Sequence, residues 1–471
     1  MSSGIRTRFY ADVMAFHPEV TGSCILLVVK FPDGTGTKFI VDCGLFQEKE
    51  LSGYNTELPF EESDIEFALI THNHVDHTGR LPFLVRKGFY RTIYLTKQTR
   101  ILIEPALEDS YRVLKSVAKR ENRAELYSTE NVGTALAKML GCEYYESIQI
   151  TTNIKATFLR NGHLPGAALI FVQISYPECE DINILFTGDY NKSNIFFDVP
   201  SIPKEIAKLP LIVVQEATYG NMDSSEIEKT YATDVAKAIR EEKTVISPAF
   251  SLGRAQEVLY EIKLMQERGE IERDIPIYLD GKLAIRYTNL YSKLDIKEEM
   301  QDFLPDNLTF VDKEIRQKLL CDHNIKIIVT SSGSGSYGPA QTYIQEYLGR
   351  TDAKILFTGY TPEGSLGRRL KDAEDGDTVE VGGLLVVKRA QVGYTREFSA
   401  HAKADEMIEF LNQFENLRMV LVNHGQTEVK EQFAKRILKE VKVKHVGVLG
   451  REYFFRVGAY GLIKTMGTKF E

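Results

Sequence analysis

Four side chains of the kinds that bind metals lie within six residues, in the stretch THNHVDHTGRLP: His72, His74, Asp76 and His77. His72 and His74 lie on the same side of an extended segment, so both imidazoles can reach one cation. Asp76 and His77 follow as the chain turns, and they can bind a second cation nearby. Imidazole and carboxylate together suit zinc, and they suit manganese or iron less well. The H-x-H-x-D-H spacing therefore predicts a metal site rather than a polar loop rich in histidine.

Two more residues are candidate ligands, because four side chains do not complete a site for two metals. His163 lies in NGHLPGAALI, where Gly162 and Gly166 let the backbone bend close to a metal. Asp189 lies in LFTGDY, directly after an apolar stretch. Each residue taken alone is more often part of a turn than a metal ligand. Beside the first cluster, we interpret both as ligands.

The hydrophobic pattern predicts the elements that position these residues. Residues 24–44 predict two strands around an Asp-Gly turn. Residues 64–71 predict an apolar strand that runs into the histidine cluster, and a helix follows the cluster. Apolar strands also precede Asp189 and Glu216. We therefore expect the further ligands to lie at the ends of other strands.

The section after Tyr219 alternates helices with strands and contains no internal repeat. We expect helices at about 226–242 and 254–268. Strands that alternate with helices predict a mainly parallel sheet. From Phe398 the chain returns to a helix, a strand, another helix and a short β tail, which favours a domain inserted in a loop of another domain. The strands expected in the section after Tyr219 include residues 244–250, 276–280, 325–332 and 353–360.

The order of the metal-binding residues resembles the motif series of the metallo-β-lactamase superfamily. The resemblance implies a four-layer αββα domain of class α/β that holds two zinc ions. Asp42, in the stretch IVDCG, matches the first motif of the family and is implied to orient the ligand loop without touching metal. The implied ligands are His72, His74 and His163 on one zinc, Asp76 and His77 on the other, and Asp189 between the two.

Three later segments resemble the motifs of the β-CASP nucleases within that superfamily. Glu216 lies in QEATYG, His401 in EFSAHAKADEMIEFL and His424 in LVNHGQTEVKEQF. In this family an α/β domain, the β-CASP domain, is inserted before the last metal ligand. The resemblance covers nearly the whole chain. The implied division gives residues 1–208 and 395–471 to the metallo-β-lactamase domain and residues 209–394 to the β-CASP domain.

The resemblance also implies a function, that of a zinc-dependent ribonuclease acting on single-stranded RNA in RNA processing or decay. A histidine at the last motif, here His424, is typical of the RNA-directed members, whereas the DNA-repair branch has an apolar residue there. His424 is implied to complete the second zinc, His401 to protonate the leaving 3′ oxygen, and Glu216 to hold the His401 ring. Members often form homodimers. Cleavage within the RNA and cleavage from its 5′ end both stay open.

Candidates for substrate binding lie in the section between these motifs. The loop TSSGSGSYGPA contains Ser332 and Gly333, and its backbone N–H groups can bind phosphate. A plain flexible turn is an equally good interpretation of that loop. Arg254 and Arg368 lie in glycine-bearing segments and are candidates for lining an RNA groove. Solvated helix caps are the alternative for both arginines.

Size and composition fit a soluble protein with two domains. The 471 residues are enough for two sizeable cores, and 43% hydrophobic with 26% charged residues is typical of globular chains. The net charge of −8 counts against a non-specific nucleic-acid binder but permits a local basic groove. No stretch approaches the ~20 apolar residues of a membrane span, and the N-terminus lacks the apolar stretch of a signal peptide. We therefore expect a cytoplasmic protein that does not contact membranes.

The five cysteines are odd in number and widely spread, without a C-x-x-C pair. That pattern argues against a disulfide framework and against a zinc site made of thiolates. We expect all of them to be buried or half-buried free thiols. They are Cys24, Cys43, Cys142, Cys179 and Cys321.

Three other functions compete with the ribonuclease. A thioester or lactam hydrolase of the same superfamily would not need the long inserted section or the pair of Glu216 and His401. A non-catalytic RNA-processing subunit would have substituted ligands, whereas every expected ligand position is filled here. A DNA nuclease is disfavoured by His424.

Overall fold

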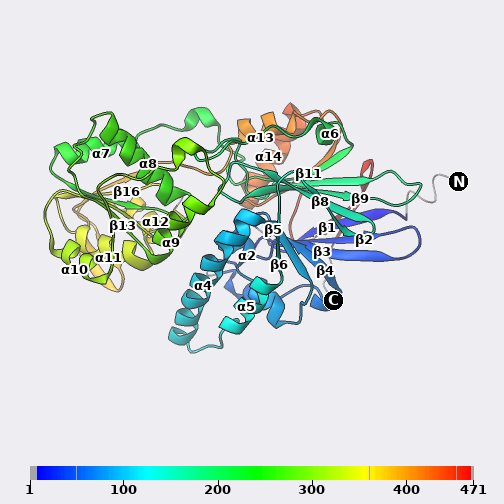
Figure 1. The fold of residues 1–471 in the computed structure, drawn as a ribbon, viewed down its shortest axis with the longest axis horizontal. Coiled ribbons are helices and arrows are strands. Elements are labelled where there is room, and N and C mark those ends of the chain that lie inside the picture. The colour runs from blue at the N-terminus through cyan, green and yellow to red at the C-terminus, as the bar shows by residue number, and fades with distance from the viewer. Residues whose placement is uncertain (1–7, 18, 49, 360, 452, 468–471) are drawn as a thin grey trace. The chain divides into compact units, whose positions relative to one another are not determined.

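The chain forms two compact units, described in a computed structural model over residues 8–467 except 18, 49, 360 and 452 (Figure 1). The first unit contains the chain up to Asn194, then Asp198–Ser224, and then the chain from His401 onward. The second unit contains Ser225–Ala400 together with Ile195–Phe197. The second unit is therefore inserted between two parts of the first, as the sequence predicted.

An eight-stranded sheet in the first unit joins both ends of the chain. Its strands, in spatial order, are β23 (Gly461–Gly467), β22 (Tyr453–Gly458), β1 (Tyr10–Ala15), β2 (Ile25–Lys30), β3 (Gly36–Val41), β4 (Ile65–Leu69), β5 (Thr92–Thr96) and β6 (Met139–Cys142). β1 pairs antiparallel with β2 on one side and with β22 on the other. From β3 to β6 the neighbours are parallel. The strand pair predicted around the Asp-Gly turn is β2 and β3, which confirms that prediction.

A seven-stranded sheet faces the first one. Its strands, in spatial order, are β21 (His445–Val448), β20 (Leu417–Asn423), β11 (Leu211–Glu216), β10 (Ile182–Phe186), β9 (Ala168–Ile174), β8 (Ile154–Arg160) and β7 (Ser147–Thr151). The four strands from β21 to β10 are parallel. The predicted division after residue 208 differs from this arrangement, because β11 pairs with β10 and β20 and so belongs to the first unit.

Helices cover the outer faces of both sheets, so the first unit has four layers (Figure 1). Side chains alternate along β2: Leu27 faces the core between the sheets, and Leu26 faces the helices outside. The helices over the eight-stranded sheet are α3 (Leu81–Arg86), α4 (Lys97–Arg120) and α5 (Thr129–Ala137). Those over the seven-stranded sheet are α6 (Lys204–Ala207), α13 (Ala404–Leu411) and α14 (Thr427–Glu440). The predicted αββα architecture is confirmed.

The second unit is an open six-stranded sheet with helices on both faces. Its strands, in spatial order, are β14 (Leu308–Phe310), β13 (Ile277–Asp280), β15 (Ile327–Thr330), β12 (Thr244–Pro248), β16 (Ala353–Phe357) and β19 (Gln391–Tyr394). All of its pairs are parallel, which confirms the predicted parallel sheet. One face packs on α7 (Tyr231–Arg240), α8 (Arg254–Glu267) and α9 (Lys282–Leu290), and the other on α10 (Lys313–Cys321), α11 (Gly338–Tyr347) and α12 (Leu366–Asp372).

Two sequence predictions in the second unit are wrong in detail. The helix expected from residue 226 begins only at Tyr231, because Tyr231 is the first residue of that segment to enter the core beneath it. Cys321 is exposed at the end of α10, where it was expected to be buried or half-buried. Cys24, Cys43 and Cys142 are buried and Cys179 is half-buried, and all five thiols are free.

A hydrogen bond within the first unit joins the segment where the chain leaves that unit to the segment that follows its return. The backbone N–H of Ser224 donates to Oδ1 of Asp405 at 2.9 Å, and the Ser224 hydroxyl donates to the other carboxylate oxygen. Ser224 is the last residue before the inserted section, and Asp405 follows the section closely. The two ends of the insertion are therefore held near each other.

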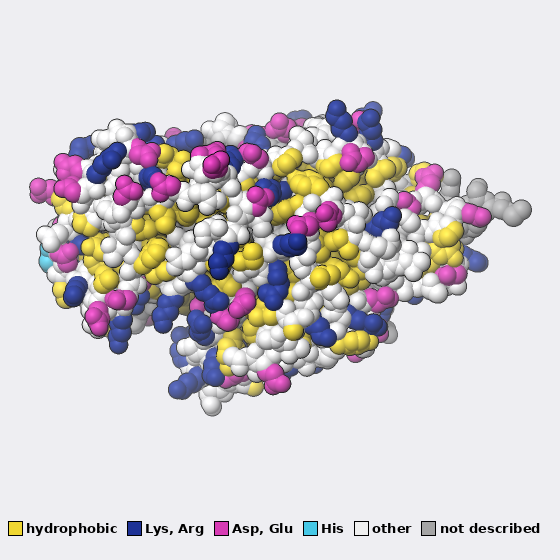
Figure 2. Space-filling model, in the orientation of Figure 1, with side chains coloured by type: hydrophobic (Ala, Val, Ile, Leu, Met, Phe, Trp, Pro, Cys, Tyr) yellow, Lys and Arg dark blue, Asp and Glu magenta, His cyan; other side chains and the backbone are white. Residues whose placement is uncertain are grey.

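Surface charge is mixed on the face drawn in Figure 2, where Lys and Arg side chains alternate with Asp and Glu. That distribution agrees with a net charge of only −8 on a chain of this length. Within the described ranges, the helices are all too short or too polar to cross a membrane.

Arg80, just after the histidine cluster, is fully buried and binds backbone oxygens at Gly22, at Gly44 and in the segment 54–57. Its guanidinium donates to Gly44, to Tyr54 at 3.1 Å and to Glu57 at 3.0 Å. Methionine at this position would keep the bulk but leave these oxygens without a donor. We expect Arg80→Met to lower the free energy of unfolding by about 3 kcal/mol. Urea denaturation followed by circular dichroism measures this loss.

A matched control for Arg80 is Arg86, an exposed arginine that donates to Glu125 and Leu126 backbone oxygens. Because water can replace these donors, we expect Arg86→Met to cost less than about 1 kcal/mol. Equal midpoints for the two variants would contradict the role given to Arg80.

Candidate metal centre

The candidate site lies at the carboxyl ends of neighbouring strands in the first unit. Asp189 follows β10, Glu216 ends β11, and His424 follows β20. β10, β11 and β20 are parallel neighbours, so these residues leave the sheet at the same edge. The histidine cluster follows β4 of the facing sheet, and His163 follows β8. The candidate ligands therefore lie at the ends of several strands, where the sequence predicted them.

The backbone around the site is closely packed and locally strained. Gly188 has φ 54°, and a Cβ built on it would lie 2.6 Å from the Cβ of Thr71. A side chain at Gly188 would therefore push the ends of β10 and β4 apart. Asp42 and His424 also have positive φ values, 62° and 46°, which are uncommon for residues other than glycine. Such conformations persist where the surrounding structure fixes them.

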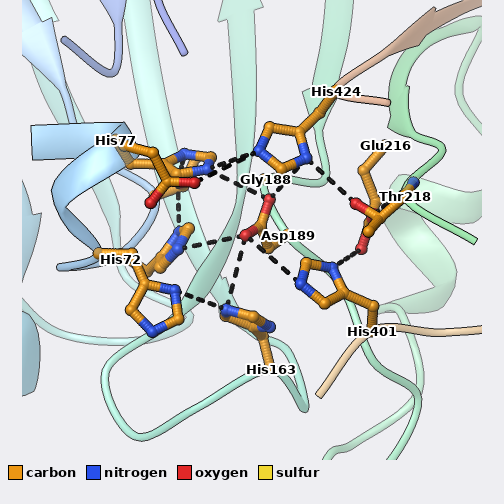
Figure 3. A network of polar contacts seen from close by, with 12 residues as sticks. His72, His77, His163, Gly188, Asp189, Glu216, Thr218, His401 and His424 are labelled. Carbon is orange, nitrogen blue, oxygen red and sulfur yellow. Dashed lines mark hydrogen bonds and ion pairs between the residues drawn. The ribbon is translucent and has the colours of Figure 1, made fainter. Parts of the chain in front are cut away.

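The seven predicted metal ligands come together in two groups (Figure 3). Within each group, the ligand atoms all lie within 4.8 Å of one another. The groups are His72, His74, His163 and Asp189 on one side, and Asp76, His77 and His424 on the other. No predicted ligand is left out of the two groups.

Asp189 belongs to the first group and also faces the second, with imidazoles of both groups around it (Figure 3). Its Oδ2 lies 3.5 Å from Nε2 of His72 and 3.6 Å from Nε2 of His163. Its Oδ1 lies 3.2 Å from Nε2 of His77 and 3.3 Å from Nδ1 of His424. One carboxylate oxygen thus faces each group, an arrangement suited to a bridging ligand.

The donor atoms fit divalent metal ions by their spacing. Two ligand atoms held at about 2.0–2.1 Å by a tetrahedral ion lie about 3.3–3.4 Å apart. The separation is 3.2 Å between His74 Nδ1 and His163 Nε2, and 3.1 Å between Nε2 of His77 and Nε2 of His424. These distances agree with ligands that share an ion.

A bound metal would also satisfy two buried polar atoms of the site. Among the described residues, buried His72 Nε2 and Asp189 Oδ1 have no partner in hydrogen-bond geometry, although imidazole nitrogens lie 3.2 Å and 3.3 Å from that Oδ1. Buried polar atoms rarely stay unsatisfied unless an ion or water completes them. Burial also lowers the pKa of His72 and His74, so both imidazoles are neutral and offer a lone pair.

Residues behind the ligands fix the orientation of the imidazoles. Asp42 Oδ2 lies 2.7 Å from Nδ1 of His77. The same carboxylate accepts from the backbone N–H and the hydroxyl of Thr71, both at 2.8 Å. On the other side, the Thr218 hydroxyl lies 3.2 Å from Nδ1 of His424. These contacts direct Nε2 of His77 and of His424 toward each other.

His401 lies beside the two groups without belonging to either. Its Nδ1 lies 2.9 Å from Oε1 of Glu216, and its Nε2 lies 3.9 Å from Oδ2 of Asp189. Glu216 is itself fixed, because it accepts from the backbone N–H groups of Tyr190 at 2.7 Å and Thr218 at 3.0 Å. The His401 side chain is 20% exposed, whereas His72, His77 and His163 are at most 1% exposed.

The surroundings favour the protonated form of His401. Burial opposes the charge on the imidazolium, but the carboxylates of Glu216 and Asp189 outweigh burial and raise the pKa of His401. The same pairing lowers the pKa of Glu216, although burial alone would raise it. A histidine held protonated within reach of the ligand groups can donate a proton there.

The candidates for substrate binding lie in the second unit, Ser332 and Gly333 in a loop at the carboxyl edge of its sheet and the two arginines in helices α8 and α12. Ser332 is half-buried, and its hydroxyl lies 3.3 Å from that of Ser334. Gly333 is buried, and a Cβ built on it would lie 2.9 Å from the backbone nitrogen of Phe250. The loop is therefore packed against its neighbour rather than a plain flexible turn.

The two candidate arginines already have partners. Arg254 is buried, and its guanidinium donates to the backbone oxygen of Thr358. It is thus neither a solvated cap nor exposed in a groove. Arg368 is half-exposed and forms ion pairs with Glu363 at 3.2 Å and with Asp372 at 3.0 Å.

Comparison with known proteins assigns the chain to a family. Three family models match it in succession: the metallo-beta-lactamase superfamily at residues 17–229, the Beta-Casp domain at 255–370, and the Zn-dependent metallo-hydrolase RNA specificity domain at 386–447. Ribonuclease TTHA0252 of Thermus thermophilus is 30% identical over 425 residues, which are 87% of this chain and 91% of that protein. The chain belongs to the β-CASP family of the metallo-β-lactamase superfamily.

Archaeal proteins are similar to this β-CASP chain as well. An RNase J-like protein of Methanocaldococcus jannaschii is 27% identical over 416 residues, 86% of this chain and 91% of that one. A transcription termination factor FttA of Methanosarcina mazei is 28% identical over 453 residues, 90% of this chain and 68% of that one. The family resemblance and fold inferred from the sequence are confirmed, and the family implies divalent metal binding at the histidine and aspartate cluster.

Sequence reasoning missed two residues of this β-CASP site, Thr71 and Thr218. Both hold metal-site residues through their hydroxyls. Thr71 directly precedes the histidine cluster, and Thr218 lies two residues after Glu216. Threonine at a strand end is too common for its spacing to reveal this role.

Asp42 is the residue whose substitution tests the orientation of the ligands. Asn at position 42 keeps the size but removes the charge that pairs with Nδ1 of His77. We expect Asp42→Asn to weaken divalent metal affinity by about 10- to 100-fold. Competition with a metal-sensitive dye measures it, and Asp33→Asn, on an exposed turn, is the control. Unchanged affinity in Asp42→Asn would remove Asp42 from the site.

Proposed function

We propose that the chain is a zinc-dependent ribonuclease that hydrolyses phosphodiester bonds of single-stranded RNA in RNA processing or decay. The observation that carries the proposal is the arrangement around Asp189. Two ligand groups share this carboxylate, and His401, which is held by Glu216, lies 3.9 Å from it. Such an arrangement combines metal binding with a positioned proton donor.

In the proposal, His72, His74 and His163 hold one zinc, Asp76, His77 and His424 hold the second, and Asp189 bridges them. Zinc is favoured because the donors are mostly imidazoles joined by carboxylates. When bound, the ions would supply activation of water near neutral pH and neutralisation of a phosphate oxygen. Asp42 keeps the His77 ring in place for this.

Proton transfer is the role proposed for His401. A phosphodiester bond that breaks toward the 3′ oxygen needs a proton on that oxygen, because an alkoxide is a poor leaving group. His401 Nε2 faces the ligand groups and can supply this proton. Glu216 takes no part in the transfer, and it fixes the ring through Nδ1 and favours the charged imidazolium.

RNA is the favoured substrate for two independent reasons. The RNA specificity model matches residues 386–447, which contain both His401 and His424. Relatives of the chain include proteins named ribonuclease and RNase J-like. A DNA nuclease, an acyl or thioester hydrolase and a non-catalytic subunit are the competing functions, and the assembled ligand groups count against the last of these.

We make separate proposals for the substrate contacts and for the oligomeric state. The Ser332 hydroxyl and the backbone at Gly333 would bind a phosphate at the carboxyl edge of the second unit's sheet. Arg368 would have to exchange Glu363 for a phosphate, because the two form an ion pair at 3.2 Å. A homodimer is proposed from the family resemblance alone, and light scattering of the purified chain measures it.

The deciding experiment uses the zinc-loaded chain and an end-labelled RNA without secondary structure. The RNA carries either a 5′ phosphate or a 5′ hydroxyl, and the same sequence is offered as duplex RNA and as single-stranded DNA. Elemental analysis of the protein, expected to give two zinc ions per chain, accompanies the assay. Asp189→Ala prepared in parallel controls for contaminating nucleases.

Each outcome of this assay has one meaning. Internal fragments indicate an endonuclease, and mononucleotides released from the 5′ end indicate an exonuclease. Cutting of DNA at an equal rate would overturn the choice of RNA. Intact RNA in the presence of two bound zinc ions would overturn the ribonuclease and direct attention to acyl and thioester substrates.

A further inference from the structure

Three loops of the second unit meet at one edge of its sheet. They follow β12, β15 and β16, which are neighbours in the order β15-β12-β16. Because these strands are parallel, all three loops leave at the carboxyl edge, where open α/β sheets bind ligands. The loop after β12 contains Phe250, the loop after β15 contains Gly333, and the loop after β16 contains Gly359.

One edge of the Phe250 ring packs against Gly333 and Gly359, and the rest of the ring is exposed. A Cβ built on Gly333 would lie 3.0 Å from Cδ2 of the ring, and one built on Gly359 would lie 3.4 Å from Cε2. A side chain at either position would press on that edge of the ring. Phe250 is nevertheless 41% exposed, although a large aromatic side chain gains by burial.

The backbone under the ring is fixed on both sides. The Ala249 N–H donates to the Thr330 oxygen at 2.8 Å, and the Ala255 N–H donates to the Phe250 oxygen at 3.0 Å, at the start of α8. Arg254 ties the loop after β16 to the same helix through the Thr358 oxygen. A ring on a backbone that is already fixed requires little further ordering of the chain when a ligand covers it.

The same carboxyl edge of the sheet carries groups that suit a phosphate chain. The hydroxyls of Ser332 and Ser334 lie 3.3 Å apart in the loop after β15, and Tyr337 at the end of that loop is 67% exposed. The exposed Lys282 starts α9 directly after Gly281, whose Cβ position lies 2.1 Å from the Ser331 hydroxyl. An aromatic face, hydroxyl donors and a lysine are the groups that bind single-stranded nucleic acids.

We propose that Phe250 stacks on one base of a single-stranded RNA and that the adjoining loop with Lys282 contacts its backbone. This inference rests on the proposed ribonuclease function and names a base-stacking site for its substrate. Every base has a π face, so the site would tolerate any sequence. A base inside a duplex has no free face, so the site would select unpaired RNA.

Binding of a fluorescent 12-nucleotide RNA with nuclease-resistant linkages to the zinc-loaded full chain, followed by anisotropy, tests the proposal. We expect Phe250→Leu to weaken the affinity about tenfold, because leucine keeps the apolar bulk but not the ring. Phe250→Tyr should keep the wild-type affinity. Phe310→Leu is the matched control, since Phe310 is 38% exposed on the edge strand β14 of the same unit.

RNA strands of the same length in which one base has been removed distinguish base stacking from an indirect effect of the Phe250→Leu substitution. In the wild type, one missing base should weaken binding about as much as Phe250→Leu does. In Phe250→Leu, removal of the same base should cost nothing further. Equal costs in both proteins at every position would overturn the stacking role.

The outcomes also separate this inference from the function on which it rests. A wild type that neither binds nor cuts RNA would end both proposals. A wild type that cuts RNA, with Phe250→Leu binding as tightly and melting at the same temperature, would end only the stacking site. In that case the exposed ring would instead belong to a protein contact.

Discussion

His401→Ala is expected to lower the rate of RNA cleavage by about 10²- to 10⁴-fold while the metal content stays unchanged. The rate falls because the leaving oxygen loses its proton donor. The metals stay because His401 belongs to neither ligand group and approaches only Asp189, at 3.9 Å. Single-turnover cleavage together with elemental analysis measures both quantities. His445→Ala, a histidine on β21 outside the site, is the control and should cut normally.

Glu216→Gln tests proton donation by His401 through the pH dependence of cleavage. The carboxylate of Glu216 helps to raise the pKa of His401, and glutamine removes that contribution. An acid must be protonated to act, so the rate falls as the pH rises through its pKa. The alkaline limb of the pH–rate profile should therefore move to lower pH in Glu216→Gln. A profile that loses height but keeps its limb would mean that Glu216 has only a structural role.

Asp189→Ala is expected to cause the largest loss of activity in this chain, about 10³-fold or more. Its two oxygens face the two ligand groups, so alanine removes a donor from both at once. Without that shared carboxylate, the imidazoles of His72 and His77 also lose the anion between them. We expect elemental analysis to find less than two metal ions per chain, in step with the loss of cleavage.

The matched control for this variant is Asp181→Ala, because Asp181 lies outside the site, just before β10, and accepts from Gln173. It should keep its metals and its rate. Full metal content in Asp189→Ala would show that the two groups bind their ions independently. Restoring the rate with excess zinc would place the defect in affinity rather than in chemistry.

Much of the metal site could be predicted from the sequence because ligands follow strong local signals. The spacing of His72, His74, Asp76 and His77 is dense enough to exclude chance, and apolar strands precede Asp189. The positioning threonines could not be predicted, because a hydroxyl orients a ring only after two distant strands meet. The Thr71 hydroxyl reaches Asp42 across 29 positions of sequence, for example.

In the second unit the sequence was less informative, because side-chain partners there come from tertiary packing. No local feature of the sequence indicates that Arg254 is buried, since the Thr358 oxygen that it binds lies 104 positions away. The sequence does indicate the ion pair of Arg368, because Asp372 follows it at the i,i+4 spacing of a helical ion pair. The packing of Phe250 involves glycines from two other loops and so had no local signal.

The insertion sets the order in which the two units can be completed during synthesis. β20, β21 and β22 follow the second unit in the chain, yet β20 pairs with β11, and β22 pairs with β1. Both sheets of the first unit, and with them His401 and His424, therefore wait for the last part of the chain. The second unit has its own core and can fold while the first still exposes unpaired strands. A ribosome that stops before residue 401 would thus release a folded insertion attached to a half-built sandwich that lacks His401 and His424.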